Sequence, residues 1–116
     1  MTQPAPIYGA TLQLAAMVLQ TTETWDTRGG TQPLPKRLQE GALRLVDHVV
    51  LALGGFDRRQ RLTAADAELQ TLRAHLFLAL QLDLMEEERF LALAEATHHV
   101  GRQLGGWIKK IQEKSP

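Results

Sequence analysis

Apolar residues recur every three or four positions along most of this chain, which is the spacing of amphipathic helices. The longest such stripe comes last and runs through Phe90, Leu93, Thr97, Val100, Leu104, Trp107 and Ile111. It predicts a helix that begins at a capping segment over residues 83–86 and extends to about Lys110 or beyond. A first helix is expected over residues 7–25, with its stripe at Ile7, Leu14, Val18 and Trp25.

Two further helices are expected between these. One begins at Pro35, because proline suits the first turn of a helix, and ends at Leu53 before the C-cap glycines Gly54 and Gly55. Its inward stripe is Leu38, Ala42, Leu45, Val49 and Leu53. Thr63 and Asp66 have the spacing of a capping box, which predicts a third helix from there to about Leu82. Its inward stripe is Ala65, Leu69, Leu72, Leu76 and Ala79.

Four helices with short links and no strand pattern predict an all-α fold, an antiparallel up-down-up-down four-helix bundle. The bundle is expected over residues 7–112, between an N-terminal tail over 1–6 and a C-terminal tail over 113–116. Several apolar residues remain after each stripe is assigned, namely Leu43, Val46, Val50, Leu78 and Leu82. They leave room for a second interface and favour a homo-oligomer.

The last helix contains three glycines within six positions, Gly101, Gly105 and Gly106, followed directly by Trp107. Each should cost about 1 kcal/mol relative to alanine, so the backbone there is expected to approach something closely. Gly101 and Gly105 share one helix face. A tight helix crossing inside the bundle and a contact between subunits would each explain the pattern, and both can hold at once.

Composition narrows the classes of partner. The chain has no cysteine, so a disulfide framework and a thiolate metal site are both ruled out. Its 13 basic and 13 acidic side chains cancel, so binding to RNA would depend on local basic patches. No signal peptide and no apolar run of membrane-spanning length is recognisable, so a cytoplasmic protein without a membrane partner is expected.

No catalytic or metal-binding constellation can be assembled. Glu95 and His98 have the Glu-x-x-His spacing of di-iron bundles, but that site needs a second such motif and further inward carboxylates, so no metal or cofactor is expected. Arg44 and His48 resemble the Arg-x(4–6)-His signature of HEPN-type ribonucleases, with only three residues between them. They are interpreted as a salt-linked surface together with Asp47. The chain is therefore expected to be neither an enzyme nor a binder of a small-molecule substrate.

Basic residues cluster in two places. Arg58, Arg59 and Arg61 fall in the expected link before the third helix, and Lys109, Lys110 and Lys114 close the fourth. An antiparallel bundle brings these two places to the same end, where arginine is well suited to bind phosphate. Arg73 and Arg102 add charge further along, whereas Asp83 and residues 86–88 make the opposite end acidic.

Two segments, residues 62–73 (LTAADAELQTLR) and residues 100–109 (VGRQLGGWIK), resemble the accessory variability determinant proteins of diversity-generating retroelements. These belong to a wider four-helix-bundle family that includes the ribosomal RNA intervening-sequence proteins. The resemblance implies a non-enzymatic partner of a reverse transcriptase, assembled as a homopentameric ring. Its positive surface would bind the polymerase and template RNA or an RNA/DNA hybrid during mutagenic copying of a variable gene.

Carried over to this chain, the resemblance makes a set of cations the candidate contacts to nucleic acid or to the reverse transcriptase: Arg58, Arg59, Arg61, Arg73, Arg102, Lys109 and Lys110. Gly101, Gly105, Gly106 and Trp107 become the candidates for close packing or oligomer contact. The alternative within the same fold is a structural bundle of the intervening-sequence type that has no polymerase partner.

Overall fold

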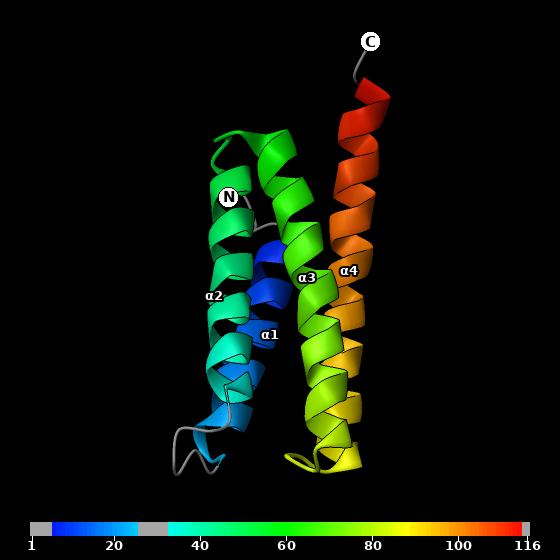
Figure 1. Cartoon of the computed structure of the whole chain (residues 1–116). Coiled ribbons are helices and arrows are strands. Elements are labelled where there is room, and N and C mark those ends of the chain that lie inside the picture. Colours follow the sequence, from blue (N-terminus) through cyan, green and yellow to red (C-terminus); the bar gives the residue numbers. More distant parts are fainter. Residues whose placement is uncertain (1–5, 26–32, 115–116) are drawn as a thin grey trace.

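The computed structural model describes residues 6–25 and 33–114, of which four helices make up nearly all. They are α1 (Pro6–Glu23), α2 (Leu34–Leu53), α3 (Arg58–Gln81) and α4 (Glu87–Lys114). Successive helices run in opposite directions, and the described ranges contain no strand (Figure 1). α1 and α3 each pack against both α2 and α4, which is the arrangement of a four-helix bundle. The all-helical prediction is confirmed.

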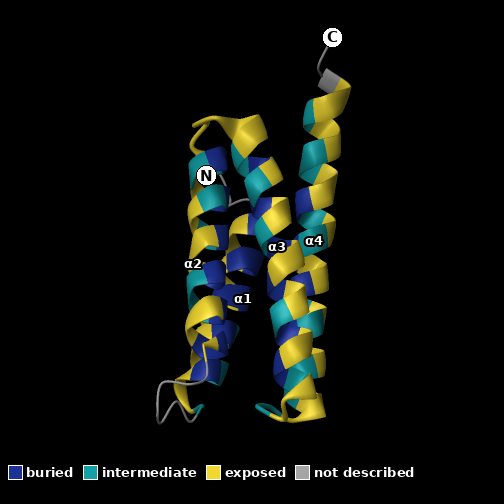
Figure 2. Ribbon diagram, in the orientation of Figure 1, coloured by how far each residue is buried: buried dark blue, intermediate teal, exposed yellow. Residues whose placement is uncertain are grey.

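The core consists of the apolar stripes that the three- and four-residue spacing predicted, and Figure 2 shows these faces turned toward the interior. The inward stripe of α3 is buried throughout. On α4 the buried members are Leu93, Thr97, Val100 and Leu104. The outer members of the stripes, Trp25, Leu53, Phe90, Trp107 and Ile111, are partly buried and pack against this core. Helical periodicity therefore identified the faces that the bundle buries.

The start of α3 differs from the sequence prediction. α3 begins at Arg58, and Thr63 lies inside the helix, where its hydroxyl donates to the carbonyl of Arg59 at 3.0 Å. The capping-box assignment at Thr63 and Asp66 is therefore wrong. The chain reverses sharply over 54–57, with Gly55 at φ +85° and Asp57 at φ +47°, so helix formation starts earlier. The three arginines 58, 59 and 61 consequently lie on the first turns of α3 and not in a link.

The helix ends differ from prediction by a few residues. Pro6, assigned to the N-terminal tail, is the first residue of α1, and α1 ends at Glu23, two residues before the predicted end. α4 starts directly after the capping segment 83–86 and continues to Lys114, beyond the predicted bundle limit at 112. Residues 1–5, the connection over 26–32 and residues 115–116 lie outside the described residues.

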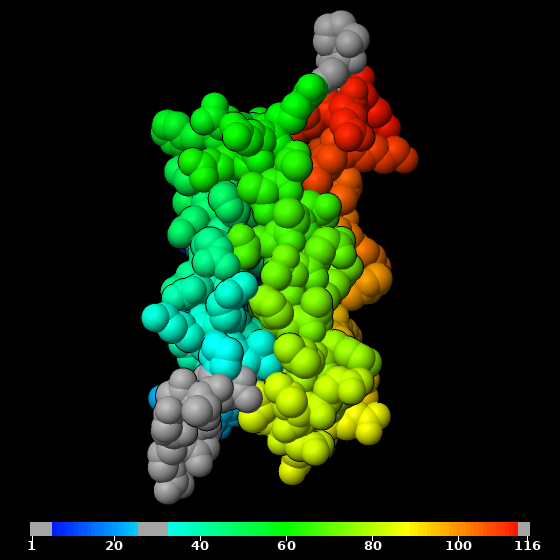
Figure 3. All heavy atoms as spheres, viewed as in Figure 1, coloured from blue at the N-terminus to red at the C-terminus, as the bar shows by residue number. Residues whose placement is uncertain are grey.

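α4 is the longest helix, with 28 residues against 18 in α1. At about 1.5 Å per residue it is roughly 15 Å longer than α1. Its C-terminal part rises past the other helices at the end of the molecule that carries the turn between α2 and α3 (Figures 1 and 3). The predicted meeting of this turn with the C-terminal end of α4 is therefore found in the structure.

Candidate nucleic-acid and protein interface

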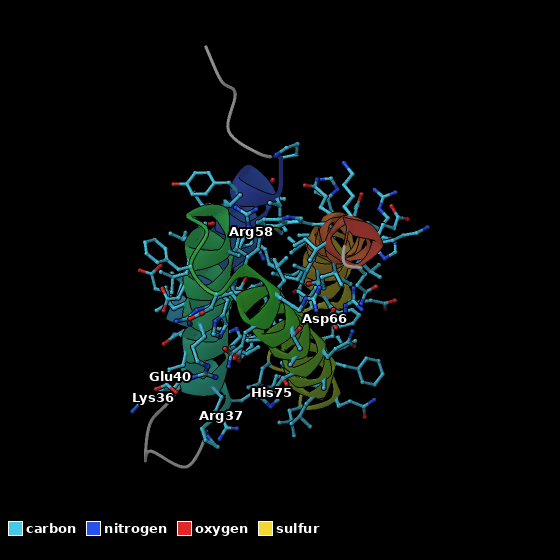
Figure 4. All side chains as sticks on the ribbon, turned by 90° about the horizontal axis from the view of Figure 1, so that it is seen from above. Lys36, Arg37, Glu40, Arg58, Asp66 and His75 are labelled. Carbon is cyan, nitrogen blue, oxygen red and sulfur yellow. The ribbon has the colours of Figure 1, made fainter. Side chains whose placement is uncertain are left out.

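Arg58 ties the turn between α2 and α3 to α4. Its Nε donates to the carbonyl of Ala52 at 2.9 Å, which satisfies an acceptor in the last turn of α2. Its guanidinium carbon lies 5.7 Å from the centroid of the Trp107 ring, a cation–π contact. Figure 4 looks down on this end of the bundle and labels Arg58 beside the turn. Arg58 is thus both an exposed cation and a part of the packing between the turn and α4.

The other cations surround the same end. Arg59 is exposed and lines a groove between α3 and α4 with Ile108 and Ile111. Lys109 and Lys110 are exposed on α4, and Arg102 lies two turns before Lys110. The side chain of Lys114 lies outside the described part of the chain. We name this group the basic end; its members are Arg58, Arg59, Arg61, Arg102, Lys109 and Lys110.

Arg61 faces α2. Its Nη1 lies 3.3 Å from Nδ1 of His48. Arg44 on α2 forms two hydrogen bonds of 3.1 Å to the carboxylate of Glu68 and an ion pair of 3.9 Å with Glu40. Hydrogen bonding to Glu68, helped by the two carboxylate charges, raises the pKa of the Arg44 guanidinium above its ordinary value.

The prediction that Arg44, Asp47 and His48 form one salt-linked surface is therefore wrong about which residues pair. Across the described part of the chain Arg44 pairs with the glutamates one turn before it and on α3, and His48 contacts Arg61. The reason lies in the packing of α2 against α3, which places Arg44 opposite Glu68. Asp47 remains exposed beside this group.

Arg73 lies at the middle of the bundle, away from the basic end. Its Nη2 is 2.5 Å from the position that a Cβ on Gly101 would occupy, and Leu69 Cδ2 is 3.4 Å from the same position. The missing side chain of Gly101 lets the Arg73 guanidinium lie against the backbone of α4. The close neighbours of Gly101 are side-chain atoms of α3 and not the backbone of a second helix, so a tight helix crossing at Gly101 stays a prediction.

Gly105 and Gly106 are different. Among the described residues, nothing lies within 4 Å of where a Cβ on either would stand, and both glycines are exposed. Packing against the described residues therefore does not account for these two glycines. Contact with another molecule remains the prediction for both. Trp107, next to them, is partly buried and packs against the core.

The opposite end of the molecule is acidic. Asp83 lies in the turn before α4, and Glu86, Glu87 and Glu88 are exposed at the start of that helix. Acidic side chains are favoured at a helix N-terminus because they meet the positive end of its dipole. The cations in the first turn of α2 and Arg89 on α4 lie at this end too, so these carboxylates are partly balanced and the separation of charge along the molecule is partial.

An uncharged apolar surface runs along α1 and α2. α1 has no charged residue from Pro6 to Thr22. Its exposed Tyr8, Leu12 and Leu19 share a flank with Thr22, and the exposed Leu43 and Val50 of α2 share a flank with Gln39. Because Gln39 donates to Thr22 at 2.9 Å, both sets lie beside the contact between α1 and α2. We name Tyr8, Leu12, Leu19, Leu43 and Val50 the α1–α2 face. The sequence predicted the exposed apolar residues of α2 but not those of α1, although the absence of charged residues over 6–22 could have indicated them.

The sequence predicts neither a metal site nor a membrane-spanning helix. Glu95 and His98 are exposed on α4, and across the described residues no three His, Asp or Glu side chains are placed to hold a metal ion. None of the helices in the described ranges combines the length and apolar character needed to cross a membrane.

No protein-family model matches this chain, and no curated protein sequence matches it significantly. The family resemblance therefore rests on residues 62–73 and 100–109 themselves. In the structure the last residue of the first segment, Arg73, lies against the second segment at Gly101.

Proposed function

We propose that this chain is the non-enzymatic accessory protein of a diversity-generating retroelement, which binds the reverse transcriptase and its template RNA during mutagenic retrohoming. The observation that carries the proposal is the basic end, where cations from α3 and α4 gather at one end of a molecule whose net charge is zero. The two motif segments support the same assignment. The protein would act in the cytoplasm as a scaffold, with no bond chemistry of its own.

Binding to RNA through such an end has a physical signature. The basic end has about six cations and can therefore neutralise only a few phosphates. The logarithm of the binding constant falls with the logarithm of the salt concentration by roughly 0.7 to 0.9 for each phosphate that is contacted. The acidic opposite end repels nucleic acid and orients the molecule. This polarity supports a defined mode of binding and not general attraction to a polyanion.

Self-association is the second part of the proposal. Contiguous exposed apolar residues on a small protein mark an interaction site, and the α1–α2 face is of this kind. A homopentameric ring would cover that face and leave the basic end for the polymerase and RNA.

A structural bundle of the intervening-sequence type, without a polymerase partner, is the second candidate. The formal net charge of zero favours it, because an RNA-binding accessory protein is expected to be basic.

The decisive experiment measures binding of the purified chain to the reverse transcriptase encoded beside its gene and to template RNA from the same element. The test variant is Arg59→Gln with Lys109→Gln at the basic end. The matched control is Lys36→Gln with Arg37→Gln, which removes the same two charge types at the other end of α2. We expect the test variant to lower RNA affinity about fivefold or more and reduce the salt slope by between one and two, and the control to bind normally. Equal binding by both variants, or no binding to either partner by the unchanged chain, would overturn the proposal.

A further inference from the structure

An open cleft of about 600 Å³ lies where α1 begins, α2 ends and the long C-terminal part of α4 extends past them. Ile7, Leu53 and Trp107 form its apolar lining. The volume is within the range of ligand-binding clefts. It arises because α1 is shorter than α4, so among the described residues α1 does not reach the outer turns of α4.

The indole of Trp107 is held in place at the cleft. It packs against the core, and the Arg58 guanidinium carbon sits 5.7 Å from its ring centroid. A fixed aromatic ring at an accessible surface binds flat partners at a low entropic cost, because few rotamers are lost on binding.

Two cations of α4 lie along the same cleft, one on either side of Gly106. Arg102, Gly106 and Lys110 are spaced four residues apart on α4 and therefore share one stripe of the helix. Arg102 and Lys110 are separated by about 12 Å along the helix axis. Gly106 between them adds no side chain, and Gln103 contributes an amide at the edge. Among the described residues that line the cleft, none is acidic.

We propose that this cleft takes an unstacked base of a single-stranded nucleic acid, stacked on Trp107, with the phosphates that flank the base at Arg102 and Lys110. The inference rests on the nucleic-acid half of the proposed function and specifies the form of the ligand. Aromatic side chains flanked by cations are the usual means of binding single strands, because every base has a flat face and every nucleotide a phosphate. A duplex, whose bases are stacked, cannot enter the cleft in this way.

The first test follows the fluorescence of Trp107. The chain has two tryptophans, so Trp25→Phe leaves Trp107 as the only emitter. This protein is titrated with a short oligouridylate and with an abasic strand of the same length. We expect the oligouridylate to quench Trp107 and the abasic strand to bind without quenching it. Equal quenching by both strands would overturn the inference.

The second test uses a matched pair of substitutions on α4. Gly106→Leu and Gly105→Leu both add a side chain where a Cβ meets nothing within 4 Å, and only Gly106 lines the cleft. We expect Gly106→Leu to lower oligouridylate affinity about fivefold or more and Gly105→Leu to leave it unchanged. Trp107→Leu should lower the affinity for the oligouridylate, whereas Trp107→Phe, which keeps an aromatic ring, should retain most of it. Equal effects of the two glycine variants would overturn the inference.

A third measurement separates this inference from the proposed function. Anisotropy of an end-labelled strand reports binding anywhere on the protein. If the strand binds while Trp107 emission stays constant, the cleft inference fails and the nucleic-acid half of the proposed function stands. If neither strand binds, the cleft inference and the nucleic-acid half of the proposed function both fail. If a leucine-containing acidic peptide quenches Trp107 and the oligouridylate does not, the cleft belongs to a protein partner and the inference is overturned.

Discussion

The guanidinium of Arg73 on α3 lies across the backbone of α4 at Gly101, with Nη2 2.5 Å from where a Cβ would stand. These two residues are 28 positions apart in the chain, and each belongs to one of the two motif segments. The contact explains why a helix of 28 residues tolerates a glycine at this position. A side chain there would force Arg73 to move.

The contact between Arg73 and Gly101 predicts non-additive effects on stability. In an Arg73→Ala background, Gly101→Ala should raise the free energy of unfolding by about 1 kcal/mol, because alanine is the better helix former. In the unchanged chain the gain should be smaller by about 0.5 kcal/mol or more, since the new methyl group displaces Arg73. Urea denaturation of all four proteins measures the coupling. Gly105→Ala in both backgrounds is the control and should give equal gains; equal gains at Gly101 would contradict the prediction.

Gly105→Ala and Gly106→Ala should each raise the free energy of unfolding by about 1 kcal/mol. The reason is that a Cβ at either position meets open space, so the gain in helix propensity is not offset by a clash. Thermal unfolding followed by circular dichroism measures it. A lower melting temperature for either variant would show that its backbone is in close contact with a neighbouring chain.

The α1–α2 face predicts how assembly responds to charge. The unchanged chain should have a mass near five chains by light scattering at physiological salt, and Leu12→Glu with Leu43→Glu should lower that mass. Both leucines are more than a third exposed, so the fold itself should tolerate the glutamates. Leu91→Glu is the control, because Leu91 is 57% exposed on α4 and lies outside this face. A monomeric unchanged chain, or an equal loss of mass with Leu91→Glu, would refute the assignment.

Most of the fold could be predicted because helical periodicity reports directly which residues are buried. The stripe from Ala65 to Ala79 is an example, since every member faces the core. The start of α3 could not be predicted in the same way. Thr63 and Asp66 have the capping-box spacing, yet the reversal depends on the positive φ angles of Gly55 and Asp57, which the sequence does not display.

The sequence predicted which residues make up the candidate site but not how their side chains are arranged. The cations at the two places were identified, and their gathering at one end followed from the antiparallel topology. The sequence could not show which of these cations also pack against other side chains, because such packing depends on residues that are distant in the sequence. Arg58 lies against Trp107, and Arg61 against His48. The three glycines looked equivalent in sequence, and of the three only Gly101 has a described neighbour, the end of the Arg73 side chain, in the space that a Cβ would occupy.

Arg44→Gln tests whether the group on α2 and α3 is structural. Arg44 donates to Glu68 through Nε and Nη2, and the Glu68 side chain is only 17% exposed, so the loss should cost about 1 kcal/mol of unfolding free energy. Lys36→Gln removes an ion pair of 4.0 Å whose lysine is 82% exposed, and should change stability by less than about 0.5 kcal/mol. Urea denaturation compares the two.

The same variants decide between an accessory protein and a nuclease. Because Arg44 is engaged by two carboxylates and His48 lies against Arg61, we expect neither to transfer a proton to or from a phosphodiester. Labelled template RNA incubated with the unchanged chain, with Arg44→Gln or with His48→Gln should therefore remain intact in every case. If the unchanged chain cleaved the RNA and His48→Gln did not, the scaffold role would have to be replaced by a catalytic one.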